Sequence, residues 1–286
     1  MQKENQEESD QAEKTSESKP KRRKVYNSNL KKKFKKPIPR TVVPSFFTLM
    51  NLFCGFLAII QVIGGKPEFA AWLIVMAGFF DLLDGFMARL ANATSLFGIE
   101  LDSLSDIVSF GVAPGILLYT FSLNELYFPG ILLSALPPLC GAVRLSRFNV
   151  EAVDENEDHS YFKGLPIPAQ AVMIVAFFLT FRDNLELFDS FKYGVNSVVI
   201  PMVVVLSFLM VSTVPFDKIP RINGKLSKKE KRQILWFLGY FIIILLFREY
   251  GLITVFAFFI VKGVIGSAIT FWKELQEDDD DHTESD

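Results

Sequence analysis

Long apolar runs, separated by short polar connections, occupy most of this sequence between residues 45 and 272. A helix that crosses a bilayer needs roughly 20 apolar residues, and its backbone groups must all be paired inside the membrane. Half of the 286 residues are apolar, and 29 are Phe. The sequence therefore predicts an all-α integral membrane protein, a polytopic bundle of about eight transmembrane helices, with six or seven as the alternative. The predicted spans are 45–64, 69–91, 96–121, 127–148, 166–182, 195–215, 233–248 and 252–272, of which the fifth and seventh are short.

Charged residues are concentrated at the two ends of the chain and in a few connections. Residues 1–40 are acidic and then basic, and residues 274–286 are acidic, which is typical of disordered polar tails. No apolar segment follows Met1, so no cleavable signal peptide is expected. Because the basic tail and the Lys/Arg-rich connection 216–232 favour the inner side, both termini are predicted to lie in the cytoplasm, with the protein in the cell (inner) membrane. The basic tail can also attract anionic membrane lipids, and no nucleic-acid partner is expected.

Four carboxylates interrupt the second and third predicted spans. Asp81 and Asp84 lie in the second span, and Asp102 and Asp106 lie in the third. Each costs about 2.5–3.5 kcal/mol at the bilayer centre, so such residues are functional candidates by default. Residues three and four apart share a helix face, and the short link 92–95 makes the two spans antiparallel neighbours. The sequence therefore predicts two acidic stripes that face each other near the cytoplasmic surface.

The residue types around these acids indicate a metal and a phosphate. Carboxylate oxygens select Mg²⁺, Mn²⁺ or Ca²⁺ rather than Zn²⁺, and the sequence leaves the choice among the three open. Gly85, Ala88 and Gly98 lack bulk where helices or a ligand must approach. Arg89, one turn beyond, has the geometry to bind a phosphate with two hydrogen bonds. Glu100 falls off the acidic stripe and is expected to be structural or to lie outside the ligand set.

The pattern D-x2-D-G-x2-A-R-x8-G-x3-D-x3-D over residues 81–106 resembles the signature of the CDP-alcohol phosphatidyltransferases at every fixed position. The resemblance implies that an alcohol displaces CMP from a CDP-linked lipid. It implies a catalytic core over 41–182, followed by additional transmembrane helices over 183–273, and a homodimer.

The resemblance also implies roles for single residues. Asp81, Asp84 and Asp102 would be ligands of Mg²⁺ or Mn²⁺, with Ca²⁺ as an alternative, and Asp106 would be the general base and a further ligand. The site for the CDP-lipid would be formed by Gly85, Ala88, Arg89 and Gly98, together with Thr48 and Asn51 of the similar early segment 44–55.

Two further segments resemble the branch of this family that transfers the phosphatidyl group of CDP-diacylglycerol to L-serine. They are Arg144-Leu-Ser-Arg147-Phe-Asn149 and the stretch 161–169, which contains Lys163 and Gly164. Arg144 and Arg147 share a helix face and are expected to bind the serine carboxylate, with Asn149 and Lys163 nearby. The arginines can instead be anchors at the membrane surface, Lys163 a loop cation and Asn149 a helix cap.

The sequence departs from the family pattern at two positions, and it leaves other functions open. Ser45 stands where many relatives carry Asn, and Gln170 replaces a small residue. Other acceptors, glycerol 3-phosphate or inositol, are the nearest alternatives, followed by a cation-coupled transporter and a prenyltransferase. Predicted spans six to eight carry no pattern that indicates chemistry.

Overall fold

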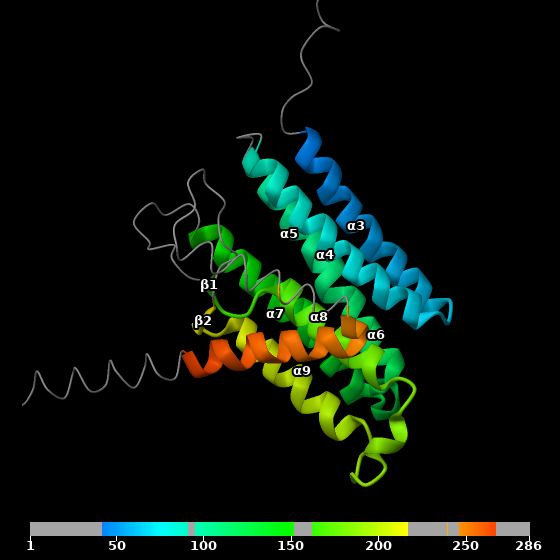
Figure 1. Ribbon diagram of the computed structural model, residues 1–286. Coiled ribbons are helices and arrows are strands. Elements are labelled where there is room, and N and C mark those ends of the chain that lie inside the picture. Colours follow the sequence, from blue (N-terminus) through cyan, green and yellow to red (C-terminus); the bar gives the residue numbers. More distant parts are fainter. Residues whose placement is uncertain (1–41, 91–94, 152–161, 217–238, 240–245, 267–286) are drawn as a thin grey trace, which may run out of the picture. The chain divides into compact units, whose positions relative to one another are not determined.

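The computed structural model describes residues 42–90, 95–151, 162–216, 239 and 246–266 (Figure 1). The chain divides into the units Met1–Val42 and Val43–Asp286, and all described residues except Val42 belong to the second. Within the described residues, five helices are long and apolar enough to cross a membrane, and two apolar helices are shorter. The prediction of an all-α membrane protein is confirmed. The count of eight helices is not confirmed, because nearly all of the predicted seventh span lies outside the described residues. The two predicted tails also lie outside them.

The first two helices, α3 (Val42–Ile63) and α4 (Pro67–Leu90), form an antiparallel pair joined by residues 64–66 (Figure 1). Pro67 opens α4 with a fixed helical φ, and Glu68 places a carboxylate at the positive end of the helix. One side of α3 exposes apolar residues three or four apart, which form a lipid-facing stripe of Phe46, Leu49, Phe53, Phe56 and Ile60.

The third membrane helix runs from Leu96 to Phe121 and consists of α5 (Leu96–Asp106), the π-helix η1 (Ile107–Val112) and α6 (Ala113–Phe121). Ser95 caps α5, because its hydroxyl accepts a hydrogen bond of 3.0 Å from the N–H of Gly98. The π-helix begins directly after Asp106. Wide turns of this kind are rare and are found mostly at functional sites.

A very close contact joins α3 to the π-helix. A Cβ atom on Gly55 would lie 2.7 Å from the Cα of Ser109 in η1, so only glycine allows the two backbones to approach this closely. The sequence position of Gly55 therefore sets the distance between α3 and the segment that follows Asp106.

After the 3₁₀ turn η2 (Leu123–Leu126), the chain continues through α7 (Phe128–Glu151), α8 (Ile167–Phe181), the 3₁₀ turn η3 (Leu185–Phe188) and α9 (Asn196–Val211). Helix α8 is the central one, since all but three of its 15 residues are buried. Because most of its residues are buried, protein rather than lipid surrounds it. Its length of about 22 Å is also less than the roughly 30 Å of hydrocarbon in a bilayer. The core of the bundle gathers around α8 from α4, α6, α7 and α9.

The predicted sixth span, 195–215, is too long at its C-terminal end. Helix α9 ends at Val211, because Ser212 adopts an extended conformation and Pro215 cannot continue a helix. The next residues, β2 (Pro215–Phe216), pair in antiparallel fashion with β1 (Phe162–Lys163). These two short strands are the β-structure of the described residues.

The loop between β1 and α8 is fastened to the end of α9. The N–H of Gly164 donates to the carbonyl of Val214, and that of Leu165 to the carbonyl of Leu209, both at 2.9 Å. Gly164 has a φ of +81°, and a Cβ atom there would lie 2.9 Å from the carbonyl oxygen of Ser212. Gly164 therefore makes a tight turn that packs against α9.

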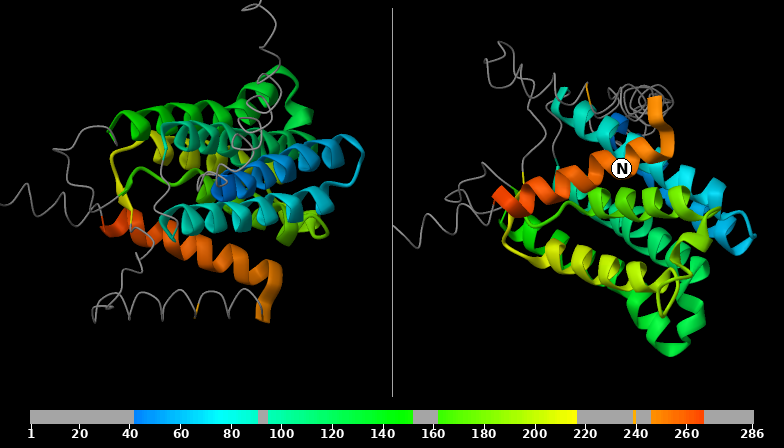
Figure 2. Two further views of the ribbon diagram at one scale, coloured as in Figure 1. Left: turned by 90° about the horizontal axis from the view of Figure 1, so that it is seen from above. Right: turned by 60° about the horizontal axis from the view of Figure 1, so that its bottom comes forward.

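The helix Leu246–Gly266, orange in Figures 1 and 2, packs against α8 through Leu252, Val172 and Ala176. Near its start Arg248 has a φ of +47°, which is outside the right-handed helical region. This turn falls where the sequence predicts the break between spans 233–248 and 252–272.

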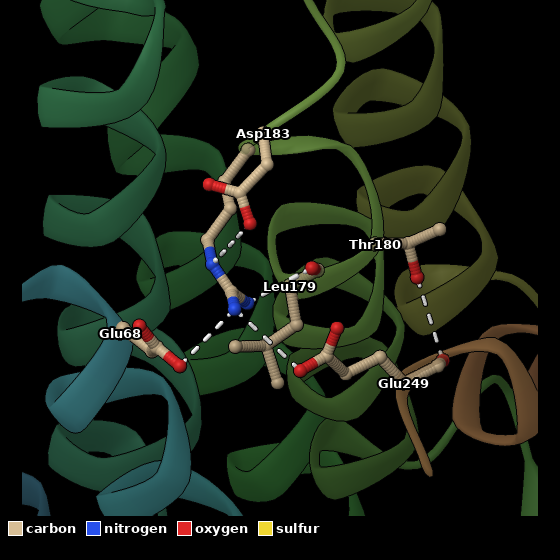
Figure 3. A network of polar contacts seen from close by, with 6 residues as sticks. Glu68, Leu179, Thr180, Asp183 and Glu249 are labelled. Atoms are coloured by element: carbon tan, nitrogen blue, oxygen red, sulfur yellow. Dashed lines mark hydrogen bonds and ion pairs between the residues drawn. The ribbon is translucent and has the colours of Figure 1, made fainter. Parts of the chain in front are cut away.

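An ion-pair network connects this helix to the ends of α4 and α8 (Figure 3). The Arg182 guanidinium lies 3.1 Å from Glu68, 3.3 Å from Asp183 and 3.6 Å from Glu249. The Thr180 hydroxyl donates to the carbonyl of Glu249. The network lies at the ends of the helices that are remote from the four aspartates, since Glu68 and Asp81 are about 20 Å apart along α4.

Candidate metal and phosphotransfer site

Helices α4 and α5 bring the four predicted carboxylates together. One carboxylate oxygen from each of Asp81, Asp102 and Asp106 lies within 4.8 Å of the others. The Asp84 carboxylate lies beside the side chain of Asp102. Asp84 and Asp106 are each only 6% exposed. The predicted facing of the two acidic stripes is therefore confirmed, whereas the role of each residue stays a prediction.

Several buried atoms around this cluster lack a hydrogen-bond partner among the described residues. They include Asp84 Oδ2, Asp102 Oδ1 and Arg144 Nε. Buried polar atoms without partners are uncommon and costly, and carboxylates this close repel unless a proton or cation lies between them. Hard oxygen donors in this arrangement suit Mg²⁺, Mn²⁺ or Ca²⁺. The residues fit a divalent cation, with Asp81, Asp102 and Asp106 offering ligand atoms and Asp84 beside them.

Helix α3 forms a third wall of the cluster. Thr48 and Asn51 are both buried and lie one turn apart on the face opposite the lipid-facing stripe. The Thr48 hydroxyl is hydrogen-bonded to Asp84. The Asn51 amide Nδ2 donates to Asp106 Oδ1 at 3.1 Å. Both residues were expected to bind the CDP-lipid, and the structure gives each of them an aspartate as partner.

The small residues of the signature lie beside the acids. The backbone N–H of Gly85 donates to the Asp84 carboxylate. Gly85 and Ala88 are half-buried on α4, and Gly98 is half-buried in the first turn of α5. Arg89 belongs to α4, but its side chain lies outside the described part of the structure.

Arg144 of α7 reaches the cluster from the other side. It is 7% exposed, and it is the only Lys or Arg that is buried among the described residues. It lies close enough to Asp106 for the opposite charges to attract. Its Nε has no partner among the described residues, and a buried, unpartnered guanidinium nitrogen has the character of a binding group for a small anion.

The other residues expected at the serine site have protein partners or fall outside the described part of the chain. The Arg147 guanidinium donates to the carbonyls of Val211 at 2.9 Å and Ser212 at 3.2 Å, at the end of α9. Asn149 Nδ2 donates to the hydroxyl of Ser103 on α5 at 3.0 Å. The Lys163 backbone is in β1, and its side chain is not among those described.

Sequence reasoning missed the contacts of α3 with the acids and the part played by Ser109. The Ser109 hydroxyl donates to the backbone carbonyl of Asn51 at 2.9 Å. A signal was present, because Thr48, Asn51 and Gly55 recur at intervals of three and four in an otherwise apolar segment.

A large hollow in the described surface lies elsewhere. It measures about 860 Å³ and opens near Lys66, Trp72 and Arg182, at the end of the helices remote from the aspartates. The buried, unpartnered polar atoms identify the chemical site better than this volume does, because a hollow at the membrane surface needs no specific ligand.

The comparisons with known proteins agree with this geometry. The family described as CDP-alcohol phosphatidyltransferase matches residues 41–209. The CDP-diacylglycerol–serine O-phosphatidyltransferase of Helicobacter pylori is 34% identical over 209 residues, which cover 73% of this chain and 81% of that protein. The protein of the same name from Bacillus subtilis is 37% identical over 174 residues (61% and 89%), and the archaetidylserine synthase of Methanothermobacter thermautotrophicus is 38% identical over 184 residues (64% and 71%). The match contains all four aspartates and the helices that hold them, so the chain belongs to the CDP-alcohol phosphatidyltransferase family and is a membrane transferase of phospholipid synthesis.

Proposed function

We propose that this enzyme transfers the phosphatidyl group of CDP-diacylglycerol to the hydroxyl group of L-serine, giving phosphatidylserine and CMP. The observation that carries the proposal is the buried Arg144, whose Nε has no partner among the described residues and which lies within electrostatic range of Asp106. An acceptor with a carboxylate can pair with Arg144 and present its hydroxyl to Asp106. Serine is also the acceptor in the names of the relatives from Helicobacter pylori and Bacillus subtilis, which supports the same assignment.

In the proposed reaction Asp106 is the general base. It takes the proton of the serine hydroxyl as that oxygen bonds to the phosphorus that carries the diacylglycerol. The bond from this phosphorus to the bridging oxygen breaks, and CMP leaves with the electron pair. Arg144 holds the serine carboxylate, so that the hydroxyl is positioned before the proton is transferred.

The metal ligands in this proposal are Asp81, Asp84, Asp102 and Asp106. A bound Mg²⁺ or Mn²⁺ would stabilise negative charge on the phosphoryl oxygens. Gly85, Ala88, Arg89 and Gly98 would form the CDP-lipid site, where small side chains leave room for the pyrophosphate. Asn149 would hold the end of α7 against α5 through Ser103, close to the acceptor.

The proposal extends to location and assembly. The acid cluster and both termini would face the cytoplasm, where serine and CDP-diacylglycerol meet, as the distribution of Lys and Arg indicates. Two chains would form a homodimer, as the family resemblance implies.

The test uses the purified full-length protein with CDP-diacylglycerol and Mg²⁺ or Mn²⁺, and follows CMP release with serine, glycerol 3-phosphate or inositol. We expect CMP release with serine and with neither of the other two alcohols. Asp106→Asn should lower kcat by about 100-fold or more, while CDP-diacylglycerol still binds. CMP release that depends on another alcohol, or that is absent with serine, would overturn the proposed acceptor. Loss of both turnover and lipid binding in Asp106→Asn would make Asp106 a ligand only.

A further inference from the structure

Asn51 is fully buried in α3, 55 residues before the aspartate that it contacts. Its Nδ2 donates to Asp106 Oδ1 at 3.1 Å. An ionised carboxylate only accepts hydrogen bonds, so the NH₂ end of the amide must face Asp106 and the oxygen end must point elsewhere. That oxygen, Asn51 Oδ1, is buried and has no partner among the residues that the structure describes.

The backbone of Asn51 is held in place independently of its side chain. Its carbonyl accepts a hydrogen bond from Ser109 Oγ, three residues after Asp106, at 2.9 Å. One turn further along α3, Gly55 allows the backbone at Ser109 to approach closely. Helix α3 and the segment 106–109 are therefore held together by two contacts that do not involve the Asn51 side-chain amide.

Stability alone does not account for an asparagine at this position. The NH₂ group of the amide satisfies Asp106 Oδ1, but that one hydrogen bond leaves the amide's own buried oxygen unpaired, which costs free energy. The amide is therefore explained better by a ligand or a reacting group than by packing.

We propose that Asn51 is a positioning residue for the acceptor half of the reaction. Its NH₂ group fixes the Asp106 carboxylate by one oxygen and leaves the other oxygen to receive the acceptor proton. Its own oxygen receives a hydrogen bond from the acceptor, for which the serine ammonium is a suitable donor. The inference rests on the proposed role of Asp106 as base, and it differs from the CDP-lipid contact that the sequence predicts for Asn51.

The experiment compares wild type with Asn51→Leu and Asn51→Asp, using kcat, the KM for serine, the dissociation constant of short-chain CDP-diacylglycerol without serine, and the apparent Tm. Asn51→Leu should lower kcat by about 30- to 300-fold, at and below the low end of the roughly 100- to 10,000-fold contribution of a general base, because Asp106 itself remains. It should also raise the KM for serine, with lipid affinity unchanged and the apparent Tm lowered no more than in Ser109→Ala, which also loses one buried hydrogen bond. Asn51→Asp should lower kcat further, because it places a carboxylate against Asp106 in place of the donor.

Ser109→Ala is the matched control, because it removes the backbone contact of Asn51 and leaves the amide. It should lower the apparent Tm and change kcat by less than about threefold, since the lost hydrogen bond fixes the backbone and not the side-chain amide. A kcat loss in Ser109→Ala as large as that in Asn51→Leu would overturn the inference, because packing would then explain both.

Two other results would also overturn it. Asn51→Leu with weaker binding of CDP-diacylglycerol and normal kcat would place Asn51 at the nucleotide-lipid site. Asn51→Leu with a lower Tm and a parallel loss of lipid binding would make it structural. If wild type uses another alcohol, the same measurements are made with that alcohol, so failure of serine as acceptor and failure of the Asn51 inference are separate results.

Discussion

At the scale of single residues, Arg144 and Arg147 differ in their burial and in their partners, although their spacing places them on the same helix face. They are three apart on α7 and share a face, which favours a common role. Arg147 instead binds the carbonyls of Val211 and Ser212, where the C-terminus of α9 concentrates partial negative charge. Arg144 is buried within electrostatic range of Asp106, and its Nε has no partner among the described residues. We therefore expect Arg144 to contact a substrate and Arg147 to hold the end of α9 in place.

This difference predicts opposite kinetic effects. Arg144→Lys keeps the charge but loses the bidentate geometry, so it should raise the KM for serine by about tenfold. Arg147→Ala loses both hydrogen bonds to α9 and should lower the apparent Tm by several degrees, with the KM changed by less than about threefold. Steady-state CMP release and thermal unfolding in detergent measure both effects. A larger KM effect in Arg147→Ala would return Arg147 to the serine site.

Among the helices and turns, the turn before α8 and the end of α9 form one unit. The backbone at Gly164 and Leu165 is hydrogen-bonded to residues 209–214, and Arg147 binds the same end of α9. Helix α9 lies outside the predicted core 41–182, yet it supports both segments that resemble the serine-transferring branch. The sixth span therefore contributes to the frame of the site.

Gly164 provides a test of this unit. Gly164→Ala adds a Cβ at a φ of +81° and against the backbone oxygens of Met210 and Ser212. Gly65→Ala is the control, because Gly65 has a φ of +73° and nothing within 4 Å of its added Cβ. The control should cost about 1–2 kcal/mol of stability through backbone strain alone, and Gly164→Ala should cost clearly more. Equal losses of apparent Tm would show that the contact with α9 contributes nothing.

At the scale of the whole molecule, the two ends of the described helix bundle differ in chemistry. One end holds the four aspartates, Arg144 and the β1–β2 pair. The other holds the Arg182 ion pairs and the hollow near Lys66. If the proposed function holds, the acidic site takes up water-soluble serine and releases CMP. We therefore predict that this end faces the cytoplasm and that the two ends lie on opposite sides of the membrane.

Labelling of single cysteines tests this orientation. The background is Cys54→Ala with Cys140→Ala, since neither cysteine forms a disulfide. The exposed residues Lys66 and Thr213 lie at the two different ends. An impermeant maleimide should label Lys66→Cys in intact cells and Thr213→Cys only after permeabilisation. The reverse pattern would put the aspartates on the outer side of the membrane.

The membrane class, most of the helix positions and the shared faces of the four aspartates can be derived from the amino-acid sequence without a structure. These properties are local, because a helix places residues three and four apart on one side whatever surrounds it. The short link between α4 and α5 then left little freedom in how the two acidic faces meet. The helix ends were predicted less well, as the early end of α9 before Pro215 shows.

Only the packing of the helices shows which polar residues contact the aspartates and which stabilise the fold. The contacts of Asn51 with Asp106, and of Arg147 with Val211, join residues 55 and 64 positions apart. Such contacts depend on which helices pack together and how closely their small residues let them approach. The spacing of residues along one helix does not show which helices pack against it. The partners of Asn51, Arg147 and Asn149 could therefore be identified only from the tertiary structure.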